Sequence, residues 1–142
     1  MKFVATLLFA SLLFAVRPDT LLAQSHQKPE KLAQKSAEAW LALTDSGKYT
    51  DSWQEASASV KAGVSPDAWF KTLTTVRSPL GKVLSRKLQN ATYTKSVPFE
   101  PEGEYVILKY ETRFAHRKHA VETITPTLDK DGKWRVSAYF IK

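Results

Sequence analysis

The chain of 142 residues carries 21 Lys and Arg against 14 Asp and Glu, and 43% of its residues are hydrophobic. This composition is enough for one folded domain and too little for two, and it excludes a largely disordered chain. The sequence contains no cysteine. Disulfides, thiolate zinc sites, iron–sulfur clusters and thiol catalysis are therefore excluded together.

The first 23 residues have the features of a secretory signal. A positive start precedes an apolar stretch over residues 3–16, and Ala23 is a small residue just before a polar run. Arg17 and Asp19 end the apolar stretch short of the roughly 20 residues that a membrane-spanning helix needs, so a cleaved signal is favoured over a retained anchor. We expect cleavage after Ala23, no transmembrane segment in the mature chain, and a periplasmic or secreted location.

The mature domain is expected to be strongly basic. Loss of residues 1–23 removes two of the 21 basic and one of the 14 acidic side chains, which leaves 19 against 13 and a net charge of +6. Such a charge favours encounter with anionic envelope components or acidic partner proteins. Nucleic acid is not expected as a partner, because an exported protein rarely meets it and the chain has no basic helix or interleaved aromatic stretch.

Three helices are predicted after a polar, flexible lead-in at residues 24–30. Apolar residues at helical spacing over 32–43 indicate the first helix, which we expect to start near Lys31. The second follows over residues 51–63. The third has the clearest start, because residues 65–67 combine a capping serine, a proline at the first helical position and an acidic first turn.

From Val83 onward the pattern alternates as in strands. Residues 83–97 are predicted as one long bent strand or two short ones, because Gln89-Asn90-Ala91 interrupts the β-forming residues. Residues 105–114 alternate cleanly, and their apolar face should meet the helices. Two further strands are predicted over residues 121–128 and 133–141.

The later strands also carry positional signals. Pro126 has no backbone N–H, so it marks a bulge or an unpaired position. Strict alternation puts four residues on one face of the last strand: Trp134, Val136, Ala138 and Phe140. The predicted fold class is α+β, with three N-terminal helices packed on one face of a curved antiparallel sheet of about four strands, and residues 31–142 form its single domain.

Several segments resemble one known family when they are taken together and in order. They are Ala37-Glu38-Ala39-Trp40-Leu41, residues 45–49 with 52–53, residues 76–81 with 85–86, residues 103–106, and residues 122–125 ahead of 131–136. In this order they look like the exported bacterial family called domain of unknown function 4019. The ending at residues 131–136 alone is shared by many cone-shaped domains similar to nuclear transport factor two. The resemblance implies a bacterial periplasmic protein and carries no known activity or functional residue.

The first candidate site is a basic hairpin between the second and third strands. Five cationic or titratable residues lie around the predicted turn: Arg113, His116, Arg117, Lys118 and His119. They form an anion contact that strengthens as the histidines protonate below about pH 6.5, or a solvated turn that keeps the protein soluble. Two histidines without a third ligand do not make a metal site, so neither a metal nor a cofactor is predicted.

A second candidate is the pair of arginines that flank the connection from helix to sheet. Arg77 and Arg86 have paired donors that suit a carboxylate or phosphate. The structural alternative is that Arg77 complements the helix dipole, Pro79 ends the helix, and Gly81 permits an unusual backbone angle.

A third candidate is a cavity between the helices and the sheet for a small apolar ligand. The aromatic residues that would line it are Trp40, Trp53, Tyr93, Tyr110 and Trp134. The alternative is that these side chains simply fill the core.

No catalytic residue is identified, because the chain has no glycine-flanked nucleophile and no glycine-rich phosphate loop. The prediction is an uncharacterised exported module, non-catalytic, that binds a protein, an envelope polymer or a small apolar ligand. The alternative is a small enzyme with an active-site cavity between helices and sheet. An acidic residue that faces the core would favour the enzyme, and the candidates are Glu111 and Glu122.

Overall fold

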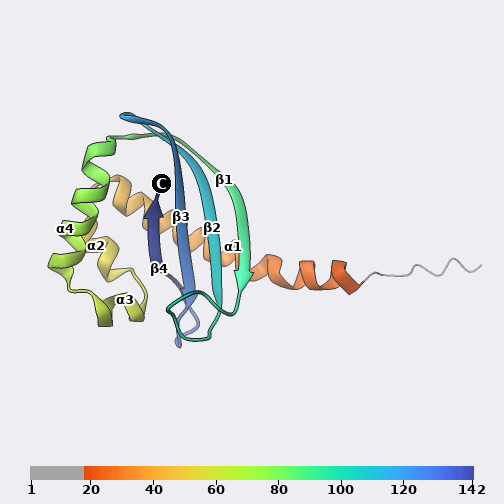
Figure 1. Cartoon of the computed structure of the whole chain (residues 1–142). Helices are drawn as coiled ribbons and strands as arrows, with labels where there is room; N and C mark the ends of the chain where they lie inside the picture. Colours follow the sequence, from red (N-terminus) through yellow and green to blue (C-terminus); the bar gives the residue numbers. More distant parts are fainter. Residues whose placement is uncertain (1–17) are drawn as a thin grey trace, which may run out of the picture.

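The computed structural model describes the chain from Pro18 to Lys142, and its side chains from His26 onward (Figure 1). The part of the expected signal at residues 1–17 lies outside the described residues. The elements in chain order are α1 (Pro18–Asp45), α2 (Tyr49–Gln54), α3 (Ala58–Gly63), α4 (Pro66–Arg77), the short 3₁₀ helix η1 (Ser78–Leu80), β1 (Val83–Thr94), β2 (Tyr105–Phe114), β3 (Arg117–Leu128) and β4 (Trp134–Ile141).

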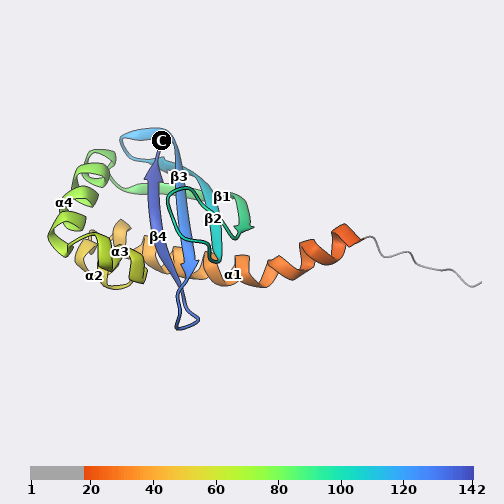
Figure 2. The ribbon, with the colours of Figure 1, turned by 60° about the horizontal axis from the view of Figure 1, so that its bottom comes forward.

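The four strands form one antiparallel sheet in the order β1-β2-β3-β4, so each strand pairs with its neighbour in sequence. Figure 1 shows α1 passing behind all four strands, which leaves the opposite face of the sheet open. The shorter helices α2, α3 and α4 lie beside β4, as Figures 1 and 2 both show. The α+β class with a four-stranded antiparallel sheet is thus confirmed.

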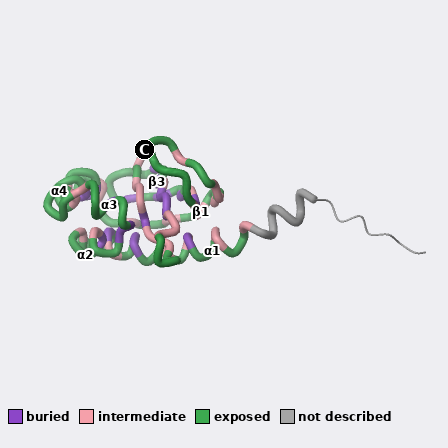
Figure 3. Tube along the Cα trace, turned by 90° about the horizontal axis from the view of Figure 1, so that it is seen from below, coloured by how far each residue is buried: buried purple, intermediate pink, exposed green. Residues whose placement is uncertain are grey.

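The core lies between α1 and the covered face of the sheet, as the buried segments in Figure 3 show. On α1, Ala33, Ala37 and Trp40 recur at helical spacing and are buried. On β2, every second residue from Val106 to Phe114 is buried. The predicted face of this strand therefore does meet the helix.

The first helix begins at Pro18 rather than near Lys31, so residues 24–30 belong to α1. Proline is compatible with a first helical position because its missing N–H has no partner there. Farther along, Glu30 accepts a hydrogen bond from the backbone N of Tyr93 at 3.2 Å, and the ring of His26 stacks on Tyr93 at 4.4 Å. These contacts with the end of β1 lengthen the part of α1 that packs on the sheet. No apolar pattern in residues 24–30 predicts them.

The predicted second helix is two short helices, α2 and α3, so four α-helices stand in the described chain where three were expected. The break falls at Ser57, whose backbone is extended (φ −61°, ψ 161°). Its backbone N donates to the carbonyl of Val136 on β4 at 2.9 Å, and its side chain caps α3 by accepting from Val60 N. This hydrogen bond to β4, 79 positions along the chain, keeps α2 and α3 from forming one continuous helix. The start of α4 is confirmed, because Ser65 accepts from Ala68 N.

Two of the four register shifts in the sheet fall where the sequence predicted an irregularity. β1 is one long strand whose register shifts between Leu88 and Asn90, as the interruption there predicted. A second shift, between Thr125 and Pro126, confirms the irregularity predicted at the proline.

The second bulge also overturns one prediction about β4. Thr125 pairs with Ala138 and Pro126 with Val136, so Ser137 is the extra residue on β4. The alternation therefore changes phase within the strand. Val136 is buried, but Phe140 is 61% exposed and does not share its face.

Candidate functional site

Four charged side chains from distant segments meet where α1 and α4 end against the sheet. Arg86 on β1 donates from Nε to Glu122 Oε1 at 2.7 Å and from Nη1 to Asp45 Oδ2 at 2.7 Å. Arg77, at the end of α4, donates from Nη2 to Asp45 Oδ1 at 2.6 Å. We call Asp45, Arg77, Arg86 and Glu122 the buried ion network. It contains two positive and two negative groups, so its charges balance.

Neutral side chains complete this network. Glu122 is fully buried and accepts further hydrogen bonds from the hydroxyls of Thr112 on β2 and Tyr139 on β4. Arg77 Nη1 donates to Tyr139 Oη at 3.1 Å, and the Arg77 guanidinium lies 5.3 Å from the ring centre of Phe114. The network therefore contacts all four strands and both long helices.

The surroundings of the buried ion network shift the pKa values of Asp45 and Tyr139. Burial raises the pKa of Asp45, but the hydrogen bonds and charges of Arg86 and Arg77 outweigh it and hold that pKa below its ordinary value. Burial and the neighbouring Glu122 carboxylate raise the pKa of Tyr139, so its hydroxyl stays protonated. Glu122 already accepts hydrogen bonds from Arg86, Thr112 and Tyr139. The network therefore joins the helices and strands that carry it, and its carboxylates are occupied by partners within the chain.

The structure thus shows what Arg77 and Arg86 contact. The paired donors that suggested an anion clamp are used by two carboxylates of the same chain, Asp45 and Glu122. Of these partners, Glu122 was recognised as a candidate for a core-facing acid. Asp45 was missed, because at the exposed end of a helix an aspartate has no local pattern that distinguishes it from a solvated one.

The basic hairpin differs from the buried ion network, because its charged side chains lie in solvent. Its residues are Arg113, His116, Arg117, Lys118 and His119. All five residues are exposed, and none forms an ion pair within the described chain. The turn is tighter than expected, since β3 already begins at Arg117. Lys109 is exposed on the same outward side of β2, with Glu111 between it and Arg113. Glu111, the other acidic candidate, is exposed there too and stands opposite Lys87 in register.

The basic hairpin is held in place by the segment that precedes β1. Ala115 N donates to the carbonyl of Lys82 at 2.8 Å and His116 N to that of Leu80 at 2.9 Å. Gly81 has φ +74°, and a Cβ there would lie 3.1 Å from Ala115 Cβ. The unusual backbone angle predicted for this glycine is confirmed, and it lets the two segments approach closely.

The five aromatic residues proposed for a ligand cavity do not line one common cavity. Trp40 is buried and donates to the carbonyl of Ser52, whereas Trp53 donates to that of Val64. Tyr93 stacks on His26 at the far end of β1. Trp40 and Trp134 border one groove, and Tyr110 lines another one.

Residues 18–142 lack two further features. No helix in this part of the chain combines the length and the apolar character needed to cross a membrane. No group of three His, Asp or Glu side chains comes together there in a way that would hold a metal ion.

The chain is thus an α+β domain in which a long helix lies across one face of an antiparallel meander. Residues 36–139 match the family described as "Protein of unknown function (DUF4019)", and the chain belongs to this family. The resemblance noted in the sequence motifs is therefore confirmed. No curated protein and no solved structure matches the chain. The matched range includes the buried ion network and the basic hairpin.

Proposed function

We propose that this chain is an exported, non-catalytic module that binds an acidic polymer of the cell envelope through the basic hairpin. The observation that carries the proposal is the group of exposed cationic side chains on the hairpin, none of which forms an ion pair within the described residues. The features of residues 1–23 support export.

The shape of the surface favours an extended ligand over a small one. The hairpin projects from the end of the sheet, and its cations lie on exposed strand positions rather than inside a pocket. Its backbone is anchored through Ala115 and His116, so little ordering is needed when a ligand arrives. Repeated contacts between fixed cations and a carboxylate- or phosphate-bearing chain would then add up along the polymer.

The absence of a catalytic role is inferred from the acids that face the core. General acid–base catalysis needs a group within reach of the substrate with a free position for the proton. Glu122 has no solvent exposure and accepts from three different side chains. This arrangement supports a structural use of the carboxylate.

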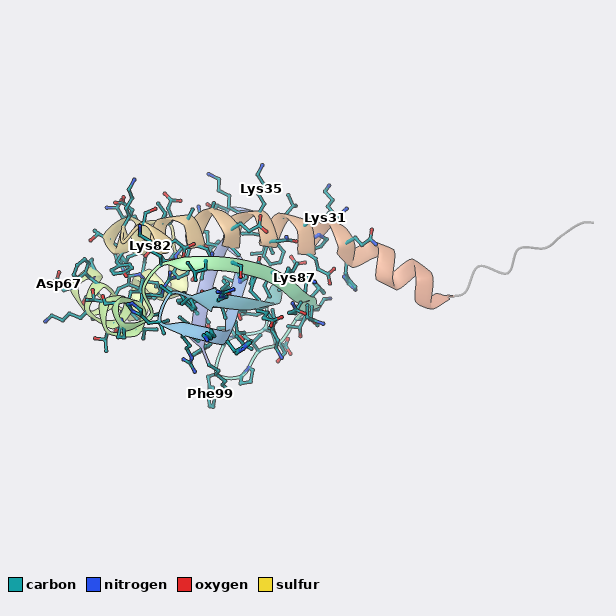
Figure 4. The ribbon with its side chains drawn as sticks, turned by 90° about the horizontal axis from the view of Figure 1, so that it is seen from above. Lys31, Lys35, Asp67, Lys82, Lys87 and Phe99 are labelled. Carbon is teal, nitrogen blue, oxygen red and sulfur yellow. The ribbon has the colours of Figure 1, made fainter. Side chains whose placement is uncertain are left out.

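The test compares two matched double variants. Arg117→Gln with Lys118→Gln removes two charges from the hairpin, and Lys31→Gln with Lys35→Gln removes two from α1, where both lysines point away from the sheet (Figure 4). The probe is polygalacturonate, and binding is measured at low and high salt. We expect the hairpin variant to bind at least about tenfold more weakly at low salt, and the α1 variant to bind nearly as well as the parent.

Equal losses in both variants would mean that net charge alone attracts the polymer, and would discard the hairpin as the site. Binding that survives 1 M salt would also contradict the proposal, because exposed charges are screened within about 3 Å under that condition.

A further inference from the structure

The open face of the sheet, on the side away from α1, continues from the basic hairpin across the strands (Figure 1). Lys109 and Arg113 are exposed on β2, and within the described residues neither forms an ion pair. Glu111, between them, stands opposite Lys87 of β1 in register. These four side chains carry three positive charges and one negative charge, so the face favours an anionic partner.

Two apolar side chains are exposed on the same face. Phe140 of β4 is 61% exposed, and Val121 of β3 is 45% exposed. Phe140 pairs with Thr123, which is two residues from Val121 on β3, so the two apolar side chains are diagonal neighbours. We call Phe140 and Val121 the apolar platform. Most of its surface is open to a ligand.

The strand register sets the distance between the apolar platform and the cations. Thr123 pairs with Phe140 on one side and with Lys109 on the other, so Lys109 and Phe140 lie two strand spacings apart, about 10 Å. Along β3, His119 of the basic hairpin is two residues from Val121. An open groove of about 290 Å³ passes over this region, and both His119 and Val121 line it. Apolar and cationic contacts therefore alternate along one extended surface.

We propose that the acidic polymer is a polysaccharide, whose sugar rings pack on the apolar platform while its carboxylates contact Lys109 and the basic hairpin. This inference rests on the proposed function of the hairpin and adds the chemistry of the repeating unit. A pyranose ring has a face rich in C–H groups, which packs on an aromatic ring, and an edge that carries its hydroxyl and carboxylate groups. An acidic polymer without rings would use the cations and leave Phe140 in water.

A second copy of the chain fits this face less well. Two identical faces would bring the excess positive charge of Lys87, Lys109 and Arg113 together, and like charges across an interface oppose association. An anionic polysaccharide supplies the opposite charge as well as an apolar surface.

The test compares two polyanions of equal length and charge at low salt: polygalacturonate, which has rings, and polyglutamate, which has none. We expect the purified protein to bind polygalacturonate about tenfold more tightly. Phe140→Ala should weaken the binding of polygalacturonate about tenfold and leave the binding of polyglutamate unchanged. Equal affinity of the parent for both polymers, or an equal loss for both in the variant, would overturn the proposal.

Two further variants separate a contact of the ring from a change in the fold. Phe140→Tyr keeps an aromatic ring and should bind polygalacturonate like the parent, whereas binding as weak as that of Phe140→Ala would refute a contact through the ring. Phe99→Ala is the matched control and should change neither affinity. Phe99 is fully exposed on the side of the sheet away from α1 (Figure 4), in the loop between β1 and β2 at the opposite end from the hairpin. Urea unfolding of each variant shows that it is folded.

The double variant Arg117→Gln, Lys118→Gln distinguishes this inference from the proposed function. It should weaken the binding of both polymers, because both are anionic. Loss of both without any preference for rings would support the hairpin as the site and refute the apolar platform. A preference for rings without any loss in the hairpin variant would do the reverse. Sedimentation of Phe140→Ala tests the second copy: a dimer that becomes a monomer would make the platform an interface between copies and overturn the proposal.

Discussion

The buried ion network and the basic hairpin use the same residue type in opposite ways. Arg77 and Arg86 find their carboxylates 32 and 36 positions away, at Asp45 and Glu122. The fold buries Arg77 and Glu122, while Arg86 is partly buried and Asp45 stays at the surface. Arg113 and Arg117 lie on an equally charged stretch of sequence but have no acid opposite them. The comparison teaches that the role of an arginine depends on which distant acid the topology brings to it.

The energetic consequences differ as well. Charges taken out of water lose hydration, and they are tolerated only when partners and hydrogen bonds replace it. The network meets this condition for most of its polar atoms, with two charges of each sign and the hydroxyls of Thr112 and Tyr139. The buried Arg77 Nε has no hydrogen-bond partner among the described residues. Exposed charges keep their hydration and contribute little to stability, so the fold does not depend on the charges of the hairpin.

The largest expected effect comes from removing one member of the network. Arg86→Ala leaves Glu122 buried without its main partner, and we expect the free energy of unfolding to fall by about 3–5 kcal/mol in urea titrations. The matched surface change, Arg117→Ala, should stay within about 0.5 kcal/mol. Similar losses from both changes would remove the distinction between the two regions.

A smaller effect is expected from the neutral part of the network. The Tyr139 hydroxyl accepts a hydrogen bond from Arg77 and donates one to Glu122. Tyr139→Phe removes both bonds, and we expect the free energy of unfolding to fall by about 1–3 kcal/mol. Tyr93→Phe is the control, because its hydroxyl bonds to Glu104 in a partly exposed setting, and it should cost less. Thermal and urea unfolding measure both, and a smaller loss for Tyr139→Phe would contradict the importance of burial here.

The loss of stability at acid pH tests whether the pairing of Asp45 with the two arginines stabilises the fold. Because Arg86 and Arg77 hold its folded-state pKa below the ordinary value of 3.8, its contribution is present above that pH and is lost as the pH falls toward the lower folded-state pKa. Asp45→Asn should therefore be less stable at neutral pH and lose less stability on acidification below pH 4. Parallel curves for parent and variant would show that the pairing does not stabilise the fold.

The smallest expected effect on folding comes from the hairpin. The double variant Arg117→Gln, Lys118→Gln should change the free energy of unfolding by less than about 0.5 kcal/mol, because neither side chain is packed or paired. Differential scanning calorimetry at low and high salt measures this. A loss of several kcal/mol would mean that the hairpin is part of the folding core, and its role as a free surface would be wrong.

Much of the secondary structure follows from local patterns in the sequence. The alternation over residues 105–114, the cap at Ser65, the turn at Gly81 and the irregularity at Pro126 all appear where they were predicted. Each depends on the backbone requirements of a few neighbouring residues: the two-residue period of a strand, an unpaired helical N–H, a positive φ, or a missing N–H. Interactions of this range are visible in a single sequence.

The tertiary structure decided the features that depend on distant partners. The break between α2 and α3 at Ser57 depends on the hydrogen bond of Ser57 to Val136. The change of phase along β4 depends on the bulge opposite Thr125 and Pro126. The partners of Arg77 and Arg86 were equally hidden, because an acid 30 or more positions away gives no local signal. Composition and spacing determine where charges occur along the chain. Only the packing of helix against sheet determines which of them are buried and paired and which stay in water, because burial makes an unpaired charge costly.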